Sequence, residues 1–433
     1  MIKNRELHYQ TVAEIKEFQE SQLAQTLKYV SQKSNFYKKR FSENNIDIEQ
    51  VKTIEDLQKL PVTTKQDLQL NGDDFVCVDR ADIIDYVTTS GTLGNPVTFA
   101  LTESDLQRLS YNEASSFTMA GLHKEDIMQL MTTIDRRFMA GLAYFMGARE
   151  LGCGIIRVGN GIPELQWDTI NRVKPTVCMV VPSFLIKLIE YAETHGIDYN
   201  SSSLKKAICI GEALRKPDGD LTKLGQKIAE KWPELELFTT YASTEMQSSF
   251  TECTYHCGGH VPSDLIIVEL LDEDNKPVPM GEPGEVTITT LGVEGMPLVR
   301  FKTGDMCIGY TEKCECGRSS MRLSSVLGRK GQMIKYKGTT LYPPALFDIL
   351  DNIPMVRNYI VEVYTNSIDT DQIQIKVGTE VQSDELIKKI KDVFRSKVRV
   401  APDIIFESPE SILKQQMPPM SRKVIKFIDK RNY

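Results

Sequence analysis

Short apolar runs alternate with helical stretches from residue 83 to residue 310, and this alternation predicts an α/β fold. The runs of strand length are IIDYVTTS, IMQLMTT, GIIRVGN, TVCMVVPS, KAICIG, LFTTYAS, LIIVELLD, EVTITTL and MCIGYT. Strands that alternate with helices are typical of parallel sheets. From residue 265 onward the strands follow one another through Pro/Gly turns. We therefore expect mixed sheets with helices, ending in an antiparallel β-module.

The regions on either side of this core have patterns of their own. Residues 7–45 carry apolar residues at helical spacing, and a Thr-Thr pair within 57–72 is a typical N-cap of a short helix. After GRKGQ, at 328–332, we expect helix, strand, strand, helix and strand at 344–352, 358–365, 372–378, 383–396 and 402–408. This pattern predicts a large N-terminal domain, residues 1–328, and a small C-terminal α+β domain, residues 332–433.

Charge and cysteine content exclude several classes of protein. The net charge is −7, which gives no electrostatic case for binding nucleic acid or an anionic membrane. No apolar run approaches the about 18 residues that span a bilayer, and MIKNRELHYQ has no signal-peptide core. We expect a cytoplasmic protein, and a homodimer is the candidate assembly. Nine cysteines in such a chain are expected to be reduced thiols, and a cluster among them favours a metal or catalytic site.

Residues 88–96, Thr-Thr-Ser-Gly-Thr-Leu-Gly-Asn-Pro, follow a predicted strand. Small hydroxyl residues and glycines allow a tight bend that points several N–H and O–H donors into one hollow, which suits phosphate. The stretch is not a Walker loop, because no Gly-Lys-Ser/Thr follows. A plain Ser/Gly turn is the alternative.

Three further patterns are weak when each is taken alone. Residues 241–245, Tyr-Ala-Ser-Thr-Glu, follow a predicted strand and could hold Mg²⁺ beside a nucleotide, or could simply begin a helix. In residues 300–305, Arg-Phe-Lys-Thr-Gly-Asp, the Asp could accept both ribose hydroxyls together with Arg329, or could lie in an ordinary β-turn. Lys423 lies in a basic tail, and such a tail is usually solvated.

Together these patterns resemble the adenylate-forming superfamily of acyl-CoA synthetases, and within it the phenylacetate-CoA ligase branch. That branch typically reads Ser-Ser-Gly-Thr-Thr-Gly-Lys-Pro where this chain has residues 89–96, and Tyr-Gly-x-(Ser/Thr)-Glu where it has 241–245. Its Arg-x-x-Thr-Gly-Asp matches 300–305, and its Gly-Arg-x-x-x-(Met/Leu)-Ile-x-x-(Lys/Arg)-Gly matches 328–338. The stretch LPVTTK, before residue 66, is also similar to this branch.

The resemblance implies an ATP site with Mg²⁺, and CoA as co-substrate. The residues implied around the β/γ-phosphates are Ser90, Gly91, Thr92 and Gly94. Those implied around adenine and ribose are Gly211, Glu212, Ala213, Tyr241, Asp305 and Arg329. Those implied for phosphate, Mg²⁺ and catalysis are Thr244, Glu245, Lys335 and Lys423, with Thr244 and Glu245 at the α-phosphate and Mg²⁺.

The implied reaction has two steps, and the small domain rotates between them. A carboxylate first attacks the α-phosphate of ATP to form an acyl-adenylate, and a thiolate then displaces AMP. Gly331 occupies the hinge position, where glycine absorbs large backbone changes. Asn95 departs from the branch, which usually has Lys there, and we expect weaker ATP use from the loss of that charge.

The resemblance also singles out a cysteine and histidine set. Some bacterial members of the branch carry a Cys-x-Cys-Gly turn together with a Cys about six residues before Gly-x-His. The matching ligands for a structural Zn²⁺ are Cys253, His260, Cys314 and Cys316, with Cys257 or His256 in reserve. Independent surface thiols are the alternative. The other cysteines lie in apolar runs and are expected to be core residues.

The leading hypothesis is an ATP-dependent, AMP-forming acid–thiol ligase acting on an aryl or arylacetic acid. An adenylating enzyme that passes its group to a carrier protein or another acceptor is the alternative, and a non-catalytic nucleotide-binding relative is a third. The expected acyl pocket includes Phe138, residues 139–148, Pro182 with Ser183, and residues near 237–241. Arg136 and Arg137 are either surface charges or a site for a polar group of the acid.

Overall fold

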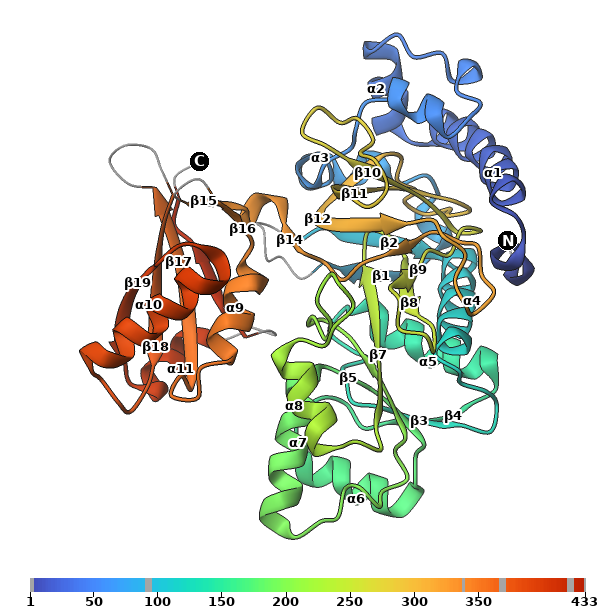
Figure 1. The fold of residues 1–433 in the computed structure, drawn as a ribbon. Helices are drawn as coiled ribbons and strands as arrows, with labels where there is room; N and C mark the ends of the chain where they lie inside the picture. Colours follow the sequence, from blue (N-terminus) through green and yellow to red (C-terminus); the bar gives the residue numbers. More distant parts are fainter. Residues whose placement is uncertain (1–3, 90–95, 337–338, 366–370, 419–423, 432–433) are drawn as a thin grey trace. The chain divides into compact units, whose positions relative to one another are not determined.

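The computed structural model describes residues 4–89, 96–336, 339–365, 371–418 and 424–431. Its contacts divide the chain into two compact units (Figure 1). The first comprises Met1–Leu221 and Gly225–Ser325, and the second comprises Thr222–Leu224 and Val326–Tyr433. The expected domain limits, 1–328 and 332–433, stay a prediction.

The first four α-helices of the first unit begin at a capping Thr or Ser side chain. Thr11 caps α1 in a reciprocal pair with Glu14, and Thr64 caps α3 in the same way with Asp67. The predicted helix over 7–45 is interrupted at Ser34, which ends α1 and caps α2. The α-helices are α1 (Val12–Lys33), α2 (Asn35–Glu43), α3 (Lys65–Leu70), α4 (Glu103–Met119), α5 (Met139–Leu151), α6 (Pro163–Val173), α7 (Pro182–His195) and α8 (Lys223–Lys231). Short 3-10 turns are η1 (Arg5–Tyr9), η2 (Ile48–Gln50), η3 (Glu55–Lys59), η4 (Gly72–Phe75) and η5 (Arg80–Asp82).

One large sheet joins parallel and antiparallel strands in the order β10-β11-β12-β13-β9-β8-β7-β6-β5-β3-β4. The parallel strands are β3 (Ile127–Leu130), β4 (Gly154–Arg157), β5 (Val177–Val180), β6 (Lys206–Cys209) and β7 (Glu236–Ser243). The strands that pair antiparallel beyond β7 are β8 (Ser248–Glu252), β9 (Gly259–His260), β10 (Ile266–Leu271), β11 (Pro283–Thr290), β12 (Phe301–Tyr310) and β13 (Arg322–Leu323). The expected α/β fold is confirmed, and the antiparallel strands continue the parallel sheet.

Burial explains why β5, in the middle of the parallel strands, is wholly apolar. All four residues of β5 are buried, as expected where helices cover both faces of a parallel sheet. Met128 and Met179 pack in one core cluster with Phe117 of α4 and Tyr144 of α5. The five cysteines expected in the core are buried, namely Cys77, Cys153, Cys178, Cys209 and Cys307.

The first predicted strand is not part of the large sheet. β1 (Ile83–Thr88) pairs antiparallel with β2 (Thr98–Thr102) in a separate two-stranded sheet. The sequence interpretation missed β2 and also β8, because β2 is short and β8 is rich in hydroxyl residues. In β8 those hydroxyls are buried against α4, where Ser249 bonds Ser116 at 3.2 Å and Asn112 at 2.9 Å.

The second unit contains a four-stranded sheet in the order β19-β18-β17-β20. Its predicted helices and strands are confirmed as α9 (Pro343–Asp351), β17 (Asn358–Thr365), β18 (Asp371–Gly378), α10 (Asp384–Val398) and β19 (Asp403–Glu407). Apolar residues of α9, α10, β17 and β18 form its own core. The elements that the sequence did not indicate are β14 (Gly328–Arg329), η6 (Lys330–Gln332), β15 (Ile334–Tyr336), β16 (Thr339–Leu341), α11 (Pro409–Gln416) and β20 (Phe427–Asp429).

Among the described residues, no helix has both the length and the apolar character needed to cross a membrane.

Candidate active site and metal centre

Candidate residues follow directly after the parallel strands of the large sheet. β3, β5, β6 and β7 are neighbours and run in one direction, so their carboxyl ends meet at a single edge. Ligands of open α/β sheets bind at this kind of edge. Phe138 lies in the segment after β3, Pro182 after β5, Gly211 after β6 and Thr244 after β7. The sheet topology therefore brings together residues that are far apart in the sequence.

Tyr241 and Asp305, expected at adenine and ribose, are in direct contact. The Tyr241 hydroxyl donates a hydrogen bond to Asp305 Oδ2 at 2.8 Å, across 64 residues of sequence. Burial raises the pKa of Tyr241 well above its ordinary value, so the phenol remains a donor. Asp305 lies within β12, where the pairing with β11 shifts register next to Gly304, whose φ of +79° suits glycine. The contact links β7 to β12 at the proposed nucleotide site.

Glu245 lies in a turn immediately after β7, and the alternative that this stretch begins a helix is wrong. Its carboxylate forms an ion pair with the ammonium of Lys65, the first residue of α3. The two side chains are 27% and 12% exposed, so the pair is largely shielded from water. Sequence reasoning assigned Lys65 no role, although it lies in the LPVTTK stretch that resembles the ligase branch. The Glu245 carboxylate therefore already faces one cation, the ammonium of Lys65.

The segment that carries Lys65 is tied to the start of β12. Thr63 N–H donates to the Arg300 carbonyl, and Lys302 N–H donates to the Thr63 carbonyl, both at 2.9 Å. Arg300 is buried and forms two 3.0 Å hydrogen bonds with the Glu269 carboxylate. It also donates to the Leu60 carbonyl at 2.6 Å. Arg300 of the Arg-x-x-Thr-Gly-Asp pattern therefore supports the 60–65 segment and is not a surface charge.

Glu212 has a structural contact beside the proposed acyl pocket. Its carboxylate accepts hydrogen bonds from Ser183 N–H at 2.8 Å and from Ser183 Oγ at 2.9 Å. Ser183 is in the first turn of α7, where free backbone N–H groups favour a negative charge. Glu212 therefore holds the start of α7, next to Pro182, and its place beside adenine stays a prediction. Gly211, with φ +77°, provides the turn that aims it, and Ala213 follows.

The remaining expected site residues fall into two groups. Residues expected in the phosphate loop and the lysine expected to be catalytic lie outside the described residues, namely Ser90, Gly91, Thr92, Gly94, Asn95 and Lys423. Three belong to the second unit, namely Arg329, Gly331 and Lys335. Their roles stay predictions.

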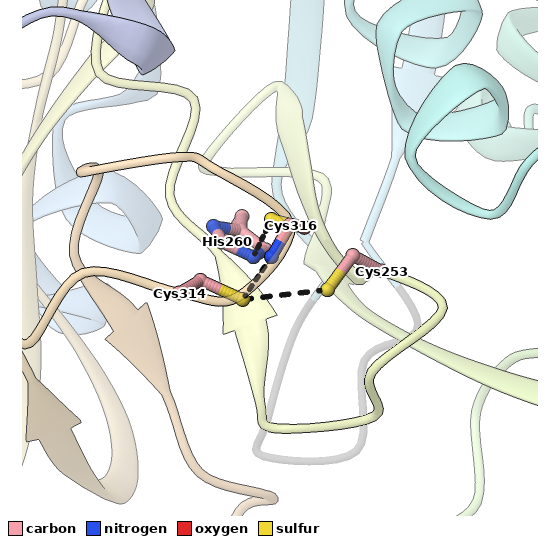
Figure 2. Close-up of side chains that lie close together, drawn as sticks. All are labelled: Cys253, His260, Cys314 and Cys316. Atoms are coloured by element: carbon pink, nitrogen blue, oxygen red, sulfur yellow. Dashed lines mark hydrogen bonds between the residues drawn. The ribbon is translucent and has the colours of Figure 1, made fainter.

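The four predicted zinc ligands lie together in the first unit (Figure 2). One donor atom from each of them lies within 4.8 Å of every other. Cys253 Sγ is 3.6 Å from Cys314 Sγ, and Cys316 Sγ is 3.5 Å from His260 Nε2. The Cys314–Cys316 turn also directs the Cys316 N–H at the Cys314 sulfur, at 3.5 Å. The alternative of independent surface thiols is therefore wrong.

The imidazole of His260 is oriented for such a cluster. Its Nδ1 lies 3.1 Å from Ser320 Oγ, which leaves Nε2 facing the sulfurs. Metal-bound histidines typically have a partner of this kind on the second ring nitrogen. Burial lowers the pKa of His260, which favours the neutral ring.

Of the two reserve ligands, only Cys257 is near the cluster. Its sulfur lies 3.3 Å from Cys314 Sγ. His256 instead lies near the carboxylates of Glu252, at 3.3 Å, and Glu236, at 3.6 Å. The backbone turns at His256, where φ is +52°, and the His256 side chain faces these carboxylates instead of the cysteine sulfurs.

The first unit holds an α/β sheet that carries Tyr241, Asp305 and Glu245, and the chain has a second, small α+β unit, the two-unit composition of an adenylate-forming enzyme. The family model for the AMP-binding enzyme matches residues 6–295. The chain belongs to this family.

Known relatives agree with the resemblance to phenylacetate-CoA ligases. The phenylacetate-coenzyme A ligase of Thermus thermophilus is 28% identical over 403 residues, covering 89% of this chain and 88% of that protein. The ligase of the same name from Escherichia coli is 26% identical and covers 98% and 96%. A crystal structure of 2-hydroxyisobutyryl-CoA ligase with 2-HIB-AMP has a TM-score of 0.85 at 21% identity, covering 98% of this chain and 91% of that chain.

Proposed function

We propose that the protein is an ATP-dependent, AMP-forming acid–thiol ligase that acts on an aryl or arylacetic acid. It would convert carboxylate, ATP and CoA to acyl-CoA, AMP and pyrophosphate through an acyl-adenylate. The observation that carries the proposal is the Tyr241–Asp305 contact, with Glu245 in the turn that follows the strand of Tyr241. The phenylacetate-CoA ligases similar to this chain support the choice of acid and thiol.

In the first step a carboxylate oxygen attacks the α-phosphorus of ATP. The new O–P bond forms as the bond to the β-phosphate oxygen breaks, and pyrophosphate leaves. Both reactants are anionic, so the site must neutralise charge in the transition state. Lys423 would supply a positive charge, and the loop with Ser90, Gly91, Thr92 and Gly94 would donate hydrogen bonds to the leaving group.

Glu245 fits a Mg²⁺ site, because carboxylate oxygens are its preferred protein ligands and this one already faces a cation in Lys65. Bound Mg²⁺ would stabilise negative charge on the phosphates. Thr244 would contact the α-phosphate. Asp305 and Arg329 would hold the ribose, and Lys335 would contact phosphate.

In the second step a thiolate of CoA attacks the carbonyl carbon of the acyl-adenylate, and AMP leaves with both electrons of the C–O bond. We propose that the small domain turns about Gly331 between the steps, withdrawing Lys423. Phe138 and Pro182, after β3 and β5, would line the acyl pocket.

The sulfur and imidazole donors fit Zn²⁺, which forms closed tetrahedral sites with Cys and His. We propose a structural zinc held by Cys253, His260, Cys314 and Cys316. It would fasten the segment after β8 to the loop after β12. A cytoplasmic location suits reduced thiolates, and the homodimer stays a prediction.

The test is a pyrophosphate-release screen over aryl, arylacetic and short aliphatic acids, with and without CoA. Acid-dependent pyrophosphate release together with a thioester product is the expected result. Pyrophosphate release without any thioester product would favour the alternative, transfer to a carrier protein or another acceptor. Specific ATP binding without pyrophosphate release from any acid would favour the non-catalytic relative.

A further inference from the structure

Arg431, close to the end of the chain, has a side chain that is only 4% exposed. A buried guanidinium must satisfy its donors within the protein, because an unpaired buried charge is strongly unfavourable. The partners that satisfy Arg431 lie within the second unit and converge on the segment after Arg329.

Two of the acceptors are backbone carbonyls of the proposed hinge. Arg431 Nη1 donates to the Met333 carbonyl at 2.8 Å, and Nη2 donates to the Gly331 carbonyl at 3.2 Å. The planar, forked guanidinium can reach both carbonyls at once, which the single ammonium of a lysine cannot do as well.

Two carboxylates fix the direction of the guanidinium. Asp429 accepts from Arg431 Nε at 2.9 Å and from Nη2 at 2.5 Å. Asp371, at the start of β18, accepts from Arg431 Nη1 at 3.0 Å and from the Lys335 N–H at 2.7 Å. The same group of contacts therefore fastens the backbone at Gly331, Met333 and Lys335.

We propose that Arg431 is a positioning residue that clamps residues 331–335 to the small domain and thereby limits where the chain can turn. The proposal rests on the proposed function, in which the small domain rotates about Gly331. A peptide group is a rigid plane, so holding the Gly331 carbonyl also holds the N–H of Gln332. Torsions of Gln332 and Met333 then lie inside the clamped stretch. The rotation is left to Gly331 itself and to the residues before it.

The chain offers a matched control in Lys430, one residue earlier. Its ammonium pairs with Glu362 of β17 at 2.7 Å, and Glu362 keeps a second partner in Lys376 at 3.0 Å. Lys430→Ala therefore removes a charged contact from the same segment without touching residues 331–335.

The first readout is hydrogen exchange of the full-length protein, which does not depend on activity. Arg431→Ala should speed exchange of the amides in 331–336 by about tenfold or more, since a hydrogen bond to a charged group is lost. Exchange in β17 and β18 should be unchanged. Arg431→Lys should give a smaller effect at the same amides, and Lys430→Ala none.

The second readout compares the two half-reactions, pyrophosphate release and thioester formation from supplied acyl-adenylate. Arg431→Ala and Arg431→Lys should change the ratio of the two rates, whereas Lys430→Ala should leave it within twofold. Unchanged exchange in 331–336 in both Arg431 variants would overturn the clamp. If Arg431→Ala loosens the whole unit, the result for Arg431→Lys decides. Faster amide exchange confined to 331–336 in Arg431→Lys supports the clamp, and unchanged exchange there overturns it. If Arg431→Ala shows the exchange effect but the unmodified protein does not adenylate any acid, the proposed function is refuted and the clamp is still supported.

Discussion

Lys65 and Glu245 form an ion pair between residues 180 positions apart, and the carboxylate involved is the one proposed to bind Mg²⁺. The pair is held from both sides, because Thr63 is hydrogen-bonded to the backbone at the start of β12 and Glu245 lies in the turn after β7. The ammonium lies against the carboxylate that the proposed Mg²⁺ would bind. Mg²⁺ and Lys65 should therefore compete for Glu245.

We predict that Lys65→Met lowers the Mg²⁺ concentration needed for half-maximal pyrophosphate release by about fivefold. The reason is that a partly shielded charge pair contributes on the order of 1 kcal/mol, which the metal no longer has to displace. Titration of Mg²⁺ at fixed ATP measures this. The control is Lys39→Met, an exposed lysine that pairs within α2 with Glu43. An unchanged or higher half-saturating concentration would show that Glu245 is not the Mg²⁺ ligand.

Lys423→Ala should abolish acyl-adenylate formation and leave thioester formation from supplied acyl-adenylate largely intact. The positive charge is needed only where two anions approach one another. The exposed Lys414 of α11 provides a control, and Lys414→Ala should alter neither half-reaction. Equal loss of both half-reactions in Lys423→Ala would indicate misfolding or another role.

Protein purified without chelator should contain about one zinc per chain, with Zn–S distances of about 2.3 Å. Elemental analysis and X-ray absorption measure these quantities. Cys314→Ser should lose the metal and unfold at a lower temperature, because a structural site contributes directly to folding. Cys257→Ser is the matched control and should keep the metal, although its sulfur is 3.3 Å from Cys314. A metal-free protein that is fully stable would contradict the zinc proposal.

Glu113 of α4 predicts a pH dependence of stability. Burial raises its pKa to about 7, although hydrogen bonds from Ser249 and Asn112 oppose the shift. A carboxyl with a raised pKa in the folded state stabilises the fold below its unfolded pKa, and this stabilisation is lost as pH rises through the folded value. Glu113→Gln should therefore stabilise the protein more at pH 8 than at pH 5. The gain in the free energy of unfolding should differ between the two pH values by up to about 3 kcal/mol.

Denaturant unfolding at the two pH values measures the Glu113 effect. Glu103, exposed at the start of the same helix, is the control, because Glu103→Gln should change stability equally at both. A Glu113→Gln effect that does not differ between pH 5 and pH 8 would mean that the carboxyl ionises normally in the folded protein.

Much of the fold could be predicted from the sequence, because local burial repeats with the period of the element. The predicted runs from IIDYVTTS to MCIGYT coincide with strands from β1 to β12, and the small unit has its predicted order of helices and strands. The strands that escaped are short, such as β2, or have polar buried side chains, as in β8, where Ser249 is satisfied by Asn112 and Ser116. The hydroxyl side chains of β8 become buried only when α4 packs against the strand.

The candidate site divides in the same way. Spacing and resemblance were enough to single out Tyr241, Asp305 and the four zinc ligands, since each lies in a compact local pattern. The meeting of Tyr241 and Asp305 depends on the tertiary structure, because β13, β9 and β8 separate β12 from β7 in the strand order and the two side chains are nonetheless hydrogen-bonded. The choice of Cys257 over His256 as the nearer reserve depends on one backbone turn.

Only the tertiary structure revealed Lys65 and Arg431. Each is an ordinary charged residue in its own stretch of sequence, and a charge is usually solvated there. Lys65 meets Glu245 because Thr63 is hydrogen-bonded to the backbone around β12, and Arg431 is buried because two carboxylates and two hinge carbonyls surround it. The sequence by itself determined most of the longer elements, the family and the local motifs, which arise from periodicity and local spacing. The partners of isolated charges were decided by contacts between distant segments, which exist only once the chain has folded.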